Sequence, residues 1–134
     1  GDYACSGLVY SYILEFHRLM LTVTDARNQL LMKVLNHIDQ AYPCDISLQQ
    51  LSDVAGVTPQ HLCRVFRDAL HMRPGEYITQ RRIRAAQELI QTTELPLAEI
   101  AGRVGFSSAG YFSTVFRRYV GTAPSSYRSH ATDP

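Results

Sequence analysis

Residues 58–67 read Thr-Pro-Gln-His-Leu-Cys-Arg-Val-Phe-Arg, and this stretch decides the fold. Thr58 is a good helix cap, and Pro59 suits the first helical position. A helix with one apolar face and one polar face can rest on a core and enter a DNA major groove. We therefore expect a recognition helix over about residues 59–69. Its apolar face carries Leu62, Val65 and Phe66, and its outward face carries Gln60, Cys63, Arg64 and Arg67.

The residues before this stretch predict a shorter helix that begins after Ser47. Gln50 follows Ser47 by three positions, as in a capping box. Gly56 suits the end of the helix, since the residue after a helix often adopts a left-handed conformation. A short helix, a glycine turn and a capped second helix form a helix-turn-helix layout. Helical hairpins of other kinds share this pattern, so a protein-interaction module without specific DNA binding is the alternative.

The same pattern occurs a second time further along the chain. Leu48-x-x-Leu51 and Gly56 are matched, at an offset of 49, by Leu97-x-x-Ile100 and Gly105. Repeats of this kind indicate duplicated supersecondary units. At an offset of 50, Leu62, Val65, Phe66 and Arg67 are matched by Phe112, Val115, Phe116 and Arg117, and Pro74 and Tyr77 by Pro124 and Tyr127.

The offset predicts a second recognition helix over about residues 108–119. Ser107 or Ser108 takes the place of Thr58 as cap, and the extra residue lies in the turn before it. Free amide groups at the start of both helices favour a phosphate. The outward face of the second helix carries short side chains, so we expect the first unit to discriminate bases better. That face comprises Gly110, Ser113, Thr114 and Arg117.

A long helix over residues 74–92 is predicted to join the two units. About nineteen residues span roughly 28 Å, at 1.5 Å per residue. With a helix width added, the recognition helices would lie near one DNA turn, about 34 Å apart, and enter successive major grooves. Arginines crowd the middle of this helix, and we expect Arg81 and Arg82 to contact phosphates.

Apolar residues upstream also recur at helical spacing. The stripe over residues 7–23 predicts a helix that either packs on its own domain or forms a homodimer seam through residues 8–23. We divide the chain into four parts. Residues 1–24 are a helical remnant or linker of a missing N-terminal domain, and residues 25–92 are the first helix-turn-helix unit with its connecting helix. Residues 93–130 are the second unit, and residues 131–134 are a tail.

The composition favours an anionic partner and excludes several other classes of protein. The net charge is only +1, but residues 58–134 hold ten basic groups against six acidic ones, so this half prefers an anionic partner. Three widely spaced cysteines fit a reducing cytosol, and neither a disulfide framework nor a metal site is expected. No nucleophile, base and orienting group can be assembled, so we expect no enzyme and no cofactor. No apolar run is long enough to span a membrane.

Both units, in order and spacing, resemble the AraC/XylS family of bacterial transcription regulators. The residues that carry the resemblance include Leu51 to Gly56, Arg64-x-Phe66-Arg67, Pro74-x-x-Tyr77, Arg82-Ile83, Val104-Gly105-Phe106, Phe116-Arg117 and Pro124-x-x-Tyr127-Arg128. The resemblance implies an all-α fold of two helix-turn-helix subdomains joined by a long central helix and preceded by an N-terminal helical remnant. It also implies that the chain binds double-stranded DNA and contacts RNA polymerase, and that residues 1–24 are the remnant of an effector or dimerisation domain. We expect a cytoplasmic, nucleoid-associated regulator and class it as an activator, with repression as the alternative.

The expected DNA interface combines the repeat with this resemblance. Base contacts are expected from Gln60, Cys63, Arg64, Ala109, Gly110, Ser113 and Thr114. Contacts with the DNA backbone are expected from Thr58, His61, Arg67, Arg81, Arg82, Ser107, Ser108, Arg117 and Tyr127.

Overall fold

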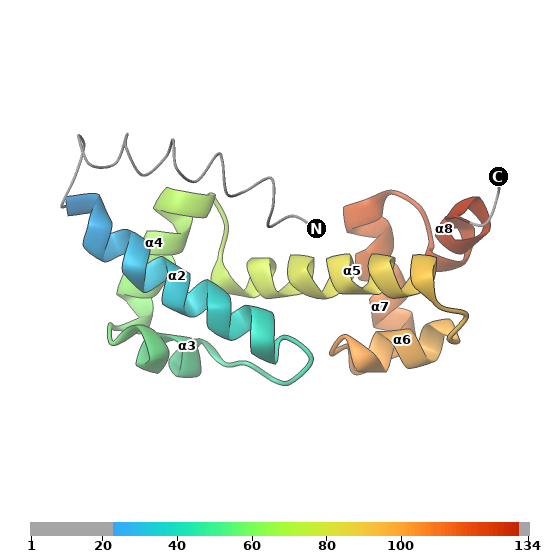
Figure 1. Cartoon of the computed structure of the whole chain (residues 1–134), viewed down its shortest axis with the longest axis horizontal. Coiled ribbons are helices and arrows are strands. Elements are labelled where there is room, and N and C mark those ends of the chain that lie inside the picture. Colours follow the sequence, from blue (N-terminus) through green and yellow to red (C-terminus); the bar gives the residue numbers. More distant parts are fainter. Residues whose placement is uncertain (1–22, 132–134) are drawn as a thin grey trace.

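The computed structural model of the chain describes residues 23–131, and every regular element in that range is an α-helix (Figure 1). The expected all-α fold is confirmed. The stripe over residues 7–23 and the predicted dimer seam lie almost wholly outside the described residues. The helices are α2 (Val23–Ala41), α3 (Leu48–Ala55), α4 (Pro59–Leu70), α5 (Pro74–Thr92), α6 (Leu97–Arg103), α7 (Ala109–Val120) and α8 (Pro124–Ala131).

Figure 1 shows α5 running through the middle of the molecule as a single long rod. The helices α2, α3 and α4 gather around its N-terminal end, and α6, α7 and α8 gather around its C-terminal end. The two helix-turn-helix units, α3–α4 and α6–α7, are therefore joined by a helix of 19 residues, as the sequence predicted.

Local chemistry explains where the first unit's helices begin and end. Ser47 accepts a hydrogen bond from the Gln50 amide at 3.1 Å, and the Gln50 side chain accepts one from the Ser47 amide at 3.0 Å. This is the predicted capping box. Gly56 ends α3 with φ of 73°, a left-handed conformation that costs glycine little.

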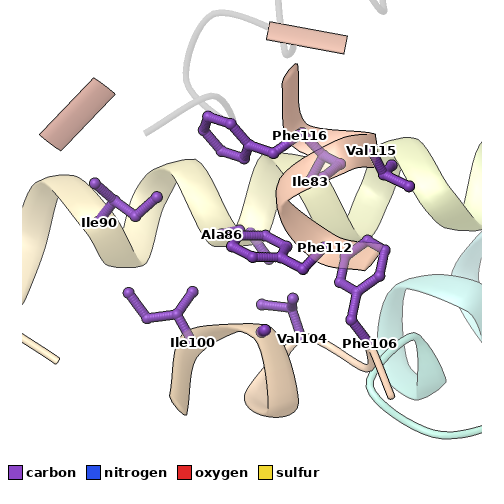
Figure 2. Close-up of a cluster of buried hydrophobic side chains, with 11 residues drawn as sticks. Ile83, Ala86, Ile90, Ile100, Val104, Phe106, Phe112, Val115 and Phe116 are labelled. Carbon is purple, nitrogen blue, oxygen red and sulfur yellow. The ribbon is translucent and has the colours of Figure 1, made fainter. Parts of the chain in front are cut away.

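Each unit has its own hydrophobic core. The first core joins α2, α3 and α4 to the start of α5 through Leu31, Val34, Ile38, Leu51, Leu62, Val65, Phe66 and Ile78. The second core, drawn in Figure 2, joins α6 and α7 to the rest of α5 through Ile83, Ala85, Ala86, Ile90, Ile100, Ala101, Val104, Phe106, Phe112, Val115 and Phe116.

The boundary between the cores lies inside α5. Ile78 is buried in the first core, and Ile83 and the buried residues after it belong to the second. The division at residues 92 and 93 assigns all of α5 to the first unit, but most of the buried residues of α5 pack in the second core. Tyr42, the first residue after α2, packs against both cores.

The repeat extends to the burial of single side chains. Residues 61–70 and 111–120 show the same order of buried, half-buried and exposed positions at all ten places. Leu62 and Phe112, for example, are 0% and 1% exposed. Since burial depends on packing against other helices, this match shows that the two units place their second helices in equivalent surroundings.

Candidate nucleic-acid interface

Both expected recognition helices begin at a side-chain cap. The Thr58 hydroxyl accepts a hydrogen bond from the His61 amide at 3.2 Å, and the Ser108 hydroxyl accepts one from the Tyr111 amide at 3.1 Å. Of the two candidate serines, Ser108 is thus the cap, and Ser107 lies one residue outside it. The other amides of each first turn have no partner within the helix and can bind an anion.

The outward face of α4 is exposed and polar. Gln60, His61, Arg64 and Arg67 are all exposed. Within residues 23–131, neither Arg64 nor Arg67 forms a hydrogen bond or an ion pair through its side chain. Their guanidinium groups therefore carry donors that an external acceptor can use.

The acidic residue of α4 points elsewhere. Asp68 lies 3.8 Å from Arg27 of α2, measured between carboxylate oxygen and guanidinium nitrogen. This exposed ion pair draws the carboxylate toward α2. The face of α4 that carries Arg64 is therefore left without a neighbouring negative charge from its own helix.

The outward face of α7 is smaller. Ala109, Gly110, Thr114 and Arg117 are exposed, and the Thr114 hydroxyl donates to the Gly110 carbonyl at 3.1 Å. A Cβ placed on Gly110 would have open space around it, with no protein atom within 4 Å. The fold itself therefore does not require glycine at this position.

The two recognition helices face one shared groove of about 870 Å³. The residues 74–79 at the start of α5 form part of its wall. Cys63 and Arg67 line it from α4, and Tyr111, Val115, Arg118 and Tyr119 line it from α7. The groove therefore lies between α4 and α7, and different faces of the two helices border it.

The structure places Cys63 at the border between the outward face of α4 and the groove. Cys63 and its equivalent Ser113 are half-buried, whereas Arg64 and Thr114 are exposed. Cys63 lines the groove between the units and lies at the edge of the outward face of α4. Because the side chain of Cys63 is small, it leaves space in the groove for a bound partner.

The sequence prediction did not include three cationic or aromatic residues that line the groove. Arg73, Arg118 and Tyr111 all line the groove, and Tyr111 is 59% exposed. Arg118 directly follows the predicted Arg117, and Tyr111 occupies the place of His61 in the repeat. The offset could have identified Tyr111, but only the tertiary structure brings Arg73 to the same groove.

Arg81 and Arg82 are engaged inside the protein. Arg81 Nε donates to the Asp39 carboxylate at 2.5 Å, and the Arg81 guanidinium lies 4.5 Å from the centre of the Tyr42 ring. Arg82 donates to the carbonyls of Tyr42 and Cys44 at 2.7 and 2.9 Å. Burial lowers the pKa of Arg81, but its bond to Asp39 gives a net rise; burial lowers the pKa of Arg82. Both stay charged.

Tyr127 is also occupied within its own unit. Its hydroxyl accepts a hydrogen bond from the Gln91 side chain at 2.6 Å, and its ring meets Phe116 edge-on. Tyr127, Arg81 and Arg82 thus make protein contacts where the sequence predicted contacts with the DNA backbone.

Two kinds of feature are absent from the described part of the chain. None of its helices is long and apolar enough to cross a membrane. No group of three or more His, Cys, Asp or Glu side chains in residues 23–131 is placed to hold a metal ion.

A family model described as a helix-turn-helix domain matches residues 51–130. The regulatory protein SoxS of Salmonella typhimurium is 34% identical over 103 residues, which cover 77% of this chain and 96% of SoxS. The transcriptional activator AarP of Providencia stuartii is 36% identical over 105 residues, 78% of each chain. The uncharacterized regulator YdiP of Escherichia coli is 33% identical over 102 residues, 76% of this chain but only 34% of YdiP.

Solved structures agree with the described fold. The DNA-binding domain of AdpA, a global transcriptional factor solved in complex with a target DNA, is 27% identical with a TM-score of 0.71. That match covers 75% of this chain and 90% of the AdpA chain. A transcriptional regulator of Chromobacterium violaceum with an AraC-type DNA-binding domain has a TM-score of 0.76 at 24% identity, over 80% of this chain and 96% of the other, and supports the fold alone.

Proposed function

The chain belongs to the AraC-type family of helix-turn-helix transcription regulators, and from this premise we propose that it binds one DNA site with both units. In this proposal α4 and α7 enter successive major grooves on one face of double-stranded DNA. The observation that carries it is the shared groove: α4 and α7 border one depression, α4 through Cys63 and Arg67, and α7 through Tyr111, Val115, Arg118 and Tyr119. An interaction module without DNA binding is not favoured by the family.

Base reading is assigned mainly to α4. Gln60 matches the donor and acceptor pattern of adenine, and Arg64 matches the paired acceptors of guanine. Both are exposed on the outward face, and Arg64 forms no side-chain bond within residues 23–131. Cys63 acts as a small spacer beside them.

The second reader, α7, contributes less base discrimination. Ala109 and Gly110 allow the backbone to approach the bases closely, and Ser113 is half-buried. Thr114 uses its hydroxyl hydrogen on the Gly110 carbonyl, so its methyl group is left for a thymine methyl. We therefore assign α7 chiefly to positioning.

Phosphate contacts are assigned to the helix starts and to the exposed arginines. The first turns after Thr58 and Ser108 present amides to an anion, and His61 and Ser107 lie beside them. Arg67 and Arg117 are exposed in the last turns of α4 and α7. We assign no phosphate contact to Arg81, Arg82 and Tyr127, because their side chains make contacts within the protein.

Site selection from random DNA, at two salt concentrations, tests this function. We expect one enriched motif with two half-elements about 10 bp apart, and log affinity that falls steeply with log salt. A motif with a single half-element would overturn the use of both helices. No enriched motif would overturn sequence-specific binding.

Three further assignments rest on relatives and on the family resemblance. We propose that the chain activates transcription, since its relative AarP is a transcriptional activator, and that it does so through contact with RNA polymerase. We place it in the cytoplasm, on chromosomal DNA. A homodimer through residues 8–23 stays a proposal whose direct test is sedimentation of the chain with and without those residues.

A further inference from the structure

The two units meet at one point besides their common helix α5. The loop after α2 runs up to the turn between α6 and α7, as Figure 1 shows, and Arg82 of α5 lies between them. The Arg82 guanidinium holds two carbonyls of that loop, Tyr42 at 2.7 Å and Cys44 at 2.9 Å. It thereby ties the first unit to a part of α5 that is packed in the second.

The second unit is shaped to receive this contact. Gly105, in the turn after α6, has φ of 110°. A Cβ on Gly105 would lie 2.7 Å from Arg82 Nε and 2.9 Å from the Tyr42 carbonyl oxygen. Real Cβ atoms do not come this close to such groups, so a residue without a side chain lets the turn rest against the Arg82–Tyr42 bond.

Neighbouring side chains reinforce the junction. Tyr42 packs against both hydrophobic cores. Arg81 stacks over its ring and pairs with Asp39 of α2. The Arg82 contact is thus part of a bracket in which α2, the loop after it, α5 and the turn before α7 converge.

Without the bracket, the first core would hold α5 only through residues near its N-terminal end. Ile78 is the buried residue of α5 in the first core, with Tyr77 partly buried beside it. These two residues lie at the start of a rod whose later residues belong to the second core. Contact over a single turn would allow the first unit to rotate about that turn. The bracket lies one turn further along α5 and opposes this rotation.

We propose that Arg82 is a positioning residue that sets the angle between the two units and so determines which spacing of DNA half-elements the protein accepts. The role in DNA spacing rests on the proposed function; the role in holding the angle does not. Arginine suits this role because its planar fork reaches two carbonyls at fixed separation, which the single ammonium of lysine does not reproduce.

The free protein offers the first test. Residual dipolar couplings report whether two parts of a molecule share one orientation. In the wild type, residues 26–75 and 85–129 should fit one alignment tensor. In Arg82→Ala the couplings of each unit should still fit the structure of that unit, but the two units should require separate, smaller tensors. A common tensor in Arg82→Ala would overturn the inference, whatever the protein does with DNA.

The second test uses DNA duplexes in which the distance between the half-elements is changed one base pair at a time. The wild type should have one sharp optimum. Arg82→Ala should bind the optimal duplex about tenfold more weakly, bind isolated half-elements as the wild type does, and accept neighbouring spacings more evenly. Arg82→Lys should fall between them, and Arg84→Ala, an exposed arginine on the same helix, should behave as the wild type.

The two tests separate the possible failures. If the wild type shows no spaced site, the proposed function fails and the couplings still decide the positioning role. If Arg82→Ala keeps the sharp optimum, the spacing role is overturned. Loss of binding to isolated half-elements would show that Arg82→Ala does not fold. Both tests are then made with Arg82→Lys. The inference is overturned if Arg82→Lys has the wild-type spacing optimum and its two units fit a common tensor.

Discussion

Phe66 and Phe116 occupy the same place in the two units. Both are 0% exposed, and each meets the edge of a tyrosine eleven residues further along the chain. The ring centroids of Phe66 and Tyr77 lie 6.1 Å apart, and those of Phe116 and Tyr127 lie 5.4 Å apart. Each pair brings α4 or α7 into contact with the helix that follows it. The duplication is therefore conserved between the units down to the geometry of one aromatic contact.

The two tyrosines differ in one hydrogen bond, which a matched pair of variants should reveal. Tyr127 accepts from Gln91 at 2.6 Å, whereas the Tyr77 hydroxyl has no such bond within residues 23–131. Tyr127→Phe should lower the free energy of unfolding by about 0.5–1 kcal/mol, and Tyr77→Phe by less. Urea denaturation measures both. Unchanged DNA affinity in Tyr127→Phe is also expected; a clear loss would restore its role at the DNA backbone.

The caps of α4 and α7 should each contribute to stability. Thr58→Ala and Ser108→Ala should each cost about 1 kcal/mol, because an amide of the first turn loses its acceptor. Ser107→Ala is the control, since Ser107 lies outside the helix and makes no cap. Thermal unfolding followed by circular dichroism gives the comparison. An equal loss in Ser107→Ala would contradict the assignment of Ser108 as cap.

Arg64 should read a base and not merely a phosphate. Arg64→Ala should weaken binding by about 1–3 kcal/mol on the selected site and relax the preference at one or two base pairs. Arg67→Ala should weaken binding by a similar factor on every sequence, with a shallower salt dependence. Competition binding against a panel of single base-pair changes separates the two patterns. Uniform weakening in Arg64→Ala would make it a phosphate contact.

Gly110 should matter to the complex and not to the free protein. Since nothing lies near its missing Cβ, Gly110→Ala should raise the free energy of unfolding by roughly 0.5 kcal/mol through helix propensity. The added methyl group should nevertheless weaken DNA binding if the backbone of α7 approaches the bases. Gly102→Ala in α6 is the control, because its Cβ would also meet open space. Wild-type affinity in Gly110→Ala would exclude close approach there.

Much of the fold could be predicted from the sequence, for reasons that are local. Caps such as Ser47 and Thr58, the glycine at residue 56 and the apolar spacing of each helix act over one or two turns, so a linear pattern reveals them. The repeat at offsets of 49 and 50 residues then predicts the second unit. The outward positions of Gln60, Arg64 and Gly110 follow from the same periodicity, and the structure finds all three exposed.

By itself, the sequence determined the helices, their duplication and the outward faces of α4 and α7, because these depend on residues within a few turns. Only the tertiary structure decided what the arginines of α5 touch, where the cores divide and which side chains line the shared groove. Adjacent arginines look alike in a sequence. Arg82 is drawn inward by carbonyls at Tyr42 and Cys44, 40 and 38 positions away, while Arg84 stays exposed. Such distant partners are brought together only by the packing of two cores on one helix.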